Sequence, residues 1–193
     1  MKATKKMNTY RLTLMGLLFA VALVLTAVEY MIPPIPMLPP GVKLGLANVV
    51  IMYCLFFLGK KQALTIVFLK SGFVFLIQGF TAFLMSLSGG LLSAAVMMLL
   101  LALPGVSLSY LVISVFGAIF HNVGQLVVAS FLLGTGMVVF YLPLLILSGV
   151  LMGYITGTLL KIVIPAFDRI DISQSYGAKT ARRSTIKKSG GKL

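Results

Sequence analysis

The sequence is short of the residue types that support metal, disulfide or hydrolytic chemistry. Its 193 residues include three carboxylates, one histidine and one cysteine. The lone Cys54 excludes an intrachain disulfide and a cysteine metal site, and His121 has no second histidine, cysteine or acid at ligand spacing. There is also no glycine-rich phosphate loop ending in Lys-Ser or Lys-Thr. We therefore expect a protein without a bound metal or cofactor that does not hydrolyse nucleotides.

Charged residues are also scarce, and apolar residues take their place. Only 10% of the residues are charged, whereas 60% are hydrophobic. A soluble domain is usually about 45–50% apolar and about a quarter charged. A chain of this composition cannot cover its surface with polar groups in water. It is predicted to be an all-α, multi-pass protein of the cell membrane.

Long apolar runs predict how the chain crosses the bilayer. A helix needs about 20 predominantly apolar residues to span the hydrocarbon core. On this criterion we expect six transmembrane helices, at residues 12–32, 44–58, 63–80, 83–103, 108–133 and 137–164. They form one transmembrane domain, residues 12–164, between a basic N-terminal tail, residues 1–11, and a basic C-terminal tail, residues 165–193, that is predicted to be disordered. The segment PPIPMLPPGVK, residues 33–43, is expected to be a stiff loop between the first two helices.

The positive charges predict the orientation of these helices. The formal net charge is +13, and most of it lies in the two tails and in the pair Lys60 and Lys61. Lys and Arg beside membrane spans are typical of cytoplasmic segments, and they also contact anionic lipid. Six spans place both tails and the lysine pair on one side, so both termini are predicted to be cytoplasmic. Nucleic acid is not an expected partner, because aromatic residues do not alternate with the basic ones.

A few polar side chains within the apolar region mark a candidate binding site. Ionisable groups in membrane spans are costly and usually face a bundle interior or a wet cavity. On the predicted topology they gather between the midplane and the outer surface, which indicates an outward-facing pocket for an anionic or polar heteroaromatic small molecule. Its candidate binding residues are Glu29, Lys43, Asn48, Lys70, Gln78, His121, Asn122 and Gln125.

Each of these residues also has a structural interpretation. Lys43 can extend its ammonium to the outer interface while its stem stays in the apolar region. Glu29 can be the ion-pair partner of Lys43 or Lys70, and His121 can be a hydrogen-bonded core residue. Lys70 is the hardest to explain structurally, because it lies too deep in its span to reach the interface.

Small residues recur at four-residue spacing on two of the predicted helices. Gly149, Gly153 and Gly157 make a smooth ridge on the last span, and Gly16 and Ala20 do the same on the first. Such ridges allow close approach of helices in membranes. For the last span we expect the glycines to serve packing within the bundle.

Three segments of the chain resemble a known family. They are PPGVKLGLANVVIMYCLFFLGKKQAL, SLSGGLLSAAVM and GAIFHNVGQLVVA, and they are similar to the Gx transporter family, which is also labelled heptaprenyl diphosphate synthase component I. That family is grouped with the substrate-binding S components of energy-coupling-factor (ECF) vitamin transporters. The resemblance implies a six-helix, S-component-like bundle that captures a small molecule. It also implies docking, through Gly16 and Ala20, onto a coupling subunit driven by two ATPases.

The enzyme label of that family implies a different role. Making polyprenyl diphosphates requires paired aspartates that hold Mg²⁺ on a diphosphate. This chain has no acid-rich motif, and Asp168 and Asp171 lie in a basic tail, so we expect it not to be the enzyme. The alternative to an importer subunit is therefore a non-catalytic accessory or scaffold subunit for isoprenoid, quinone or flavin-linked electron-transfer proteins.

Overall fold

A computed structural model of the chain describes residues 9–31, 45–103, 108–134, 136–162 and 164–165, and every regular element among them is a helix. Most of both predicted tails, and the proline-rich loop with Lys43, lie outside the described residues. The main helices are α1 (Thr9–Met31), α2 (Asn48–Tyr53), α3 (Lys60–Leu101), α4 (Tyr110–Leu133) and a C-terminal helix (Leu142–Ile162). A π-helical turn (Cys54–Leu58) extends α2, and a 3₁₀ segment (Gly136–Tyr141) precedes the C-terminal helix.

Four of these helices are long and apolar enough to cross a membrane. They are α1, α3, α4 and the C-terminal helix. Many of their large apolar side chains, such as Leu76 and Phe131, face outward rather than into the protein. A lipid environment suits such a surface, so the predicted class, an all-α membrane protein, is confirmed.

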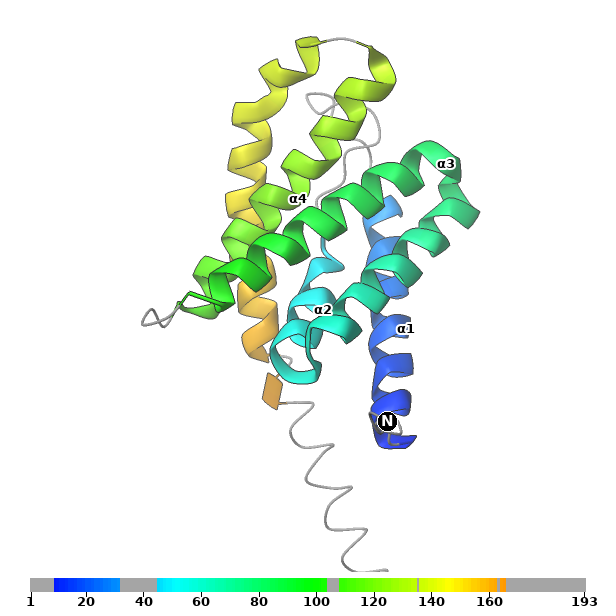
Figure 1. Ribbon diagram of the computed structural model, residues 1–193, viewed down its shortest axis with the longest axis vertical. Coiled ribbons are helices and arrows are strands. Elements are labelled where there is room, and N and C mark those ends of the chain that lie inside the picture. The colour runs from blue at the N-terminus through cyan, green and yellow to red at the C-terminus, as the bar shows by residue number, and fades with distance from the viewer. Residues whose placement is uncertain (1–8, 32–44, 104–107, 135, 163, 166–193) are drawn as a thin grey trace, which may run out of the picture.

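The third and fourth predicted helices form one element, α3, that folds back on itself. A straight helix of its 42 residues would be about 63 Å long, roughly twice the thickness of the hydrocarbon core. Gly79 interrupts it with φ 83° and ψ −173°, a left-handed conformation that favours glycine. The two arms then run side by side (Figure 1). The Ser71 and Ser86 hydroxyls lie 3.2 Å apart across them, and Phe75 stacks edge-on against Phe83 near the turn.

The second predicted span is shorter in the structure than the sequence indicated. Its helical part, Asn48–Leu58, has a length of about 16 Å, half of the hydrocarbon core. Every residue of α2 is buried, and the helix contacts α1, α3 and α4. A helix that is hydrophobic all round is stable when other helices surround it. The apolar run at residues 44–58 therefore reflects burial within the bundle.

The glycine ridge of the C-terminal helix packs against α4, as the sequence predicted. A Cβ atom at Gly153 would lie 2.4 Å from the Val115 Cα, and one at Gly149 would lie 2.9 Å from the Ile119 Cα. The two backbones are therefore in direct contact. The side chains of Ser114 and Thr156 add a hydrogen bond of 2.6 Å between the same helices.

The two faces of α1 differ in how deeply they are buried. Leu18, Ala22 and Glu29 are buried against the bundle. Gly16 and Ala20 lie on the exposed face, and no atom of the described residues comes within 4 Å of a Cβ placed on Gly16. These two small residues therefore take no part in packing within the described bundle.

Candidate functional site

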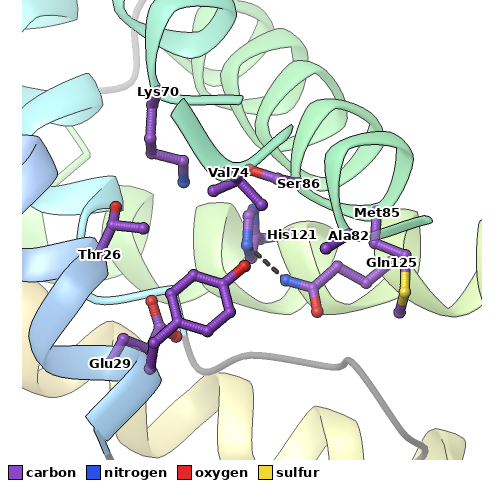
Figure 2. Close-up of a pocket in the computed structure, with 10 residues that line it drawn as sticks. Thr26, Glu29, Lys70, Val74, Ala82, Met85, Ser86, His121 and Gln125 are labelled. Atoms are coloured by element: carbon purple, nitrogen blue, oxygen red, sulfur yellow. Dashed lines mark hydrogen bonds between the residues drawn. The ribbon is translucent and has the colours of Figure 1, made fainter. Parts of the chain in front are cut away.

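Polar side chains from three helices surround one small cavity where α1, α3 and α4 meet (Figure 2). Its volume is about 20 Å³, which is room for a single water molecule. The lining residues are Thr26, Glu29, Tyr30, Lys70, Val74, Ala82, Met85, Ser86, His121 and Gln125. Opposite charges and hydrogen-bonding groups thus meet inside an otherwise apolar bundle.

The helical periodicity and the α3 hairpin bring these residues together. Thr26, Glu29 and Tyr30 lie three to four positions apart near the end of α1, so they share a face. His121 and Gln125 are one turn apart on α4. Lys70 comes from the first arm of α3, about 15 Å along the helix from Lys60. The second arm adds Ala82, Met85 and Ser86 to the same cavity because the chain reverses at Gly79.

Glu29 links α1 to the beginning of the short buried helix. Its Oε1 atom accepts a hydrogen bond from the backbone N–H of Gly45. Gly45 has φ +83°, and a Cβ there would lie 2.7 Å from Asn48 Nδ2 and 2.9 Å from His121 Cδ2. Both the backbone conformation and the close approach therefore require glycine at this position. The turn is closed by the Asn48 N–H, which donates to the Gly45 carbonyl at 2.9 Å.

Lys70 supplies a cation to the cavity. The residue is 4% exposed, and its side chain points into the space that Glu29 and His121 also face (Figure 2). Within the described residues, the Lys70 ammonium forms no hydrogen bond and no close ion pair. The Glu29 charge acts on it across the cavity. Lys70 is thus held near a counter-charge without an acceptor at contact distance.

The hydrogen bonds of His121 set its protonation. Gln125 Nε2 lies 2.6 Å from His121 Nε2. With the amide nitrogen as donor, the ring nitrogen accepts, so the imidazole is neutral and carries its proton on Nδ1. Both amide atoms of Asn48 have no hydrogen-bond partner among the described residues, whereas the His121 ring also interacts with the backbone of Gly89. Buried polar atoms are usually hydrogen-bonded, so this cluster has spare capacity for a water molecule or a ligand.

The structure brings together only part of the predicted site. Glu29, Lys70, His121 and Gln125 line the cavity, and Asn48 lies beside it. Gln78 is exposed, outside the cavity.

Asn122 faces another helix. Its Nδ2 atom donates to the Leu145 carbonyl at 2.9 Å and to the Ser148 hydroxyl at 3.0 Å. It therefore links α4 to the C-terminal helix. Lys43 lies outside the described residues.

Three polar residues of the cavity were not predicted from the sequence. Thr26 and Tyr30 could have been found, because they lie on the same face of the helix as Glu29. Ser86 could not, because its approach to Lys70 depends on the tight reversal at Gly79.

A second, wider hollow of about 630 Å³ lies between α4 and the C-terminal helix. Its described lining is almost entirely apolar and includes Leu126, Phe131 and Leu142, with no charged side chain among the described residues. It therefore lacks the charged groups that line the cavity around Lys70.

Membrane-length apolar helices around a small, buried polar cavity define a multi-pass membrane protein with an internal charged site. The family comparison agrees: a model described as heptaprenyl diphosphate synthase component I matches residues 18–163, so the chain belongs to that family. The match includes every described residue of the cavity. Searches of curated proteins and of solved structures find no match.

Proposed function

We propose that this chain is a non-catalytic membrane subunit that assists a separate catalytic component of prenyl diphosphate synthesis. The family description supports this, because it names one component of a synthase. The observation that carries the proposal is the position of Glu29. It is the sole carboxylate in residues 12–164, and it is engaged by the Gly45 N–H beside Lys70. Holding Mg²⁺ on a diphosphate takes several carboxylate ligands, so that chemistry belongs to the partner.

The topology gives such a partner a surface on which to dock. We propose that the six apolar segments lie within the membrane, the second of them as a short helix buried in the bundle, with both termini and the Lys60–Lys61 pair in the cytoplasm. In support, the beginning of α1, the junction between α2 and α3, and the end of the C-terminal helix lie toward one end of the molecule (Figure 1). A soluble synthase would bind at that end and release its product, whose prenyl chain is apolar, directly beside the bilayer.

Co-purification and activity together test this function. We expect the tagged chain, extracted gently from its native membrane, to retain a soluble prenyl diphosphate synthase component. Membranes with both components should elongate prenyl diphosphates faster than membranes with the catalytic component alone, and the purified chain with Mg²⁺ should be inactive. Synthesis by the chain alone, or a catalytic component that neither binds nor responds, would contradict the proposal.

A second candidate function is substrate capture for a small-molecule importer. The observation in its favour is the Lys70 ammonium, which faces a cavity beside the unsatisfied amide atoms of Asn48. Pockets for organic ligands are usually about 300–1,000 Å³, so capture requires residues 45–48 to move away from Glu29. The exposed Gly16 and Ala20 would then bind an ECF coupling subunit with two ATPases. The same co-purification distinguishes the two functions, because an importer subunit would retain the coupling subunit and its ATPases and not the synthase.

Cysteine labelling tests the topology. Cys54 is buried and free, so Cys54→Ala provides a background without other thiols. In that background we expect Met37→Cys to react with a membrane-impermeant maleimide in intact cells, because residue 37 is placed outside. Lys188→Cys should react only after permeabilisation. Labelling of position 188 in intact cells would reverse the orientation.

A further inference from the structure

We propose that the hollow between α4 and the C-terminal helix binds the apolar chain of a prenyl diphosphate that lies in the surrounding bilayer. This inference rests on the proposed function, because prenyl diphosphate synthesis is what places such a chain beside this protein. It assigns a ligand site outside the charged cavity, at residues to which the family description gives no role.

The hollow forms where the glycine ridge of the C-terminal helix ends. Gly149 and Gly153 allow backbone contact with α4, but the next position on the same face, one turn nearer the start of the helix, is Leu145. Asn122 still donates to the Leu145 carbonyl at 2.9 Å. Beyond this bond the two helices diverge toward their connection (Figure 1), and the space between their ends is the hollow of about 630 Å³.

The size and the lining of the hollow fit the hydrocarbon part of an organic ligand. Pockets for such ligands usually have about 300–1,000 Å³ and mostly apolar walls, whereas the cavity around Lys70 has room for one water molecule. Among the described residues that line the hollow, Ser130 contributes the one hydroxyl group and the others are apolar.

The hollow is reached from the lipid. Val127 and Phe131 line it, and they are 62% and 90% exposed on a helix of membrane length. The hydrocarbon core of a bilayer contains no water that could fill the space, and walls without contacting atoms lose dispersion attraction. A hydrocarbon chain from the bilayer therefore enters between the two helices.

Open space beside two glycines favours a methyl-branched chain over a straight one. No atom of the described residues lies within 4 Å of a Cβ placed on Gly134 or on Gly136. A straight acyl chain has no side groups that extend into this space, whereas a prenyl chain has a methyl branch on each unit. The branches add dispersion contacts, so the prenyl chain binds more tightly than the acyl chains of the membrane.

The position of the hollow suits a long prenyl chain. Leu142, at its edge, is about 28 Å along the C-terminal helix from Lys161, which is close to the thickness of the hydrocarbon core. In the proposed topology the synthase binds at the Lys161 end. A chain whose diphosphate is still at that end reaches the hollow only if it crosses most of the membrane.

Photo-crosslinking in liposomes tests this proposal. The purified chain is reconstituted with geranylgeraniol or with hexadecanol, each with a diazirine at its far end; the two main chains have equal length, but only the first is methyl-branched. We expect the peptide with residues 123–142 to be labelled about tenfold more strongly by the branched probe, a ratio typical of methylene-sized differences in apolar pockets. Unlabelled heptaprenyl diphosphate, added during reconstitution, should compete with this probe.

Two pairs of variants locate the site. Val127→Trp fills the hollow and should reduce the labelling about tenfold, whereas Val24→Trp, at a position that is also 62% exposed, should not. Gly136→Val fills the space for the branches and should remove the preference between the two probes. Gly16→Val, at another glycine with no described atom within 4 Å of the new Cβ, should keep that preference. Melting temperatures show whether each variant is folded.

The proposal is overturned if the two probes label the hollow equally or if heptaprenyl diphosphate does not compete. It is equally overturned if each variant and its control change the labelling alike. None of these measurements involves the synthase. A synthase that co-purifies with the chain, together with a hollow that shows no preference, would remove this site and leave the proposed function standing.

Discussion

Gly153→Val is expected to lower the melting temperature more than any other single glycine substitution in the C-terminal helix. A Cβ at this position would lie 2.4 Å from the Val115 Cα and 3.0 Å from the Ser114 carbonyl oxygen. These are backbone atoms, which cannot rotate away as a side chain can. Overpacking usually costs about 1–3 kcal/mol, and here the two helices must separate, so we expect a loss at or above the upper value.

Gly16→Val is the matched control for this prediction. It introduces the same side chain into another apolar helix, at a position where no described atom lies within 4 Å of the new Cβ. Its melting temperature in the same detergent should stay close to that of the wild type. Equal losses in the two variants would show that valine disturbs these helices by itself and that the contact with Val115 is unimportant.

The second large effect concerns the opposite charges of Glu29 and Lys70. Removing one partner of a buried pair typically costs about 3–5 kcal/mol, whereas replacing both partners is often neutral or stabilising. We expect Lys70→Met alone to destabilise the bundle, because the favourable interaction between the Lys70 and Glu29 charges is then lost. The double variant Glu29→Gln/Lys70→Met should recover most of that stability.

A double-mutant cycle measures this coupling. The free energy of unfolding is compared for the wild type, both single variants and the double variant, and interacting residues give a non-additive result. Lys161→Met, which removes an exposed charge, should change little. Additive losses would mean that Glu29 and Lys70 are energetically independent.

Local patterns in the sequence were enough to predict the class and the helix positions. Apolar runs gave the helices, and the four-residue spacing of Gly149, Gly153 and Gly157 correctly indicated packing. The length of the second helix could not be predicted in this way. Burial inside a bundle and exposure to lipid select the same apolar residues, so residues 44–58 resembled a full span, although among the described residues of this run only Asn48–Leu58 is helical.

The candidate site was predicted in part, for a related reason. Polar residues in apolar helices were easy to identify, but their partners depend on tertiary contacts. His121 and Gln125 share a face of α4, whereas Asn122 is rotated by about 100° and points to the C-terminal helix. The bond between Glu29 and the Gly45 N–H joins residues on either side of the proline-rich segment. No local spacing indicates such a contact.

The order of the cavity residues along the chain has a consequence for biosynthesis. Glu29 precedes Lys70, and both precede His121, so the α3 hairpin leaves the ribosome when α1 is already complete. A lysine at the centre of a helix costs about 2.5–3.5 kcal/mol during insertion by the translocon. The first arm of α3 therefore enters a membrane in which its acidic counterpart is already present, while the histidine has yet to be made. The insertion efficiency of α3 should then depend on Glu29, through a charge contact that forms before the bundle is complete.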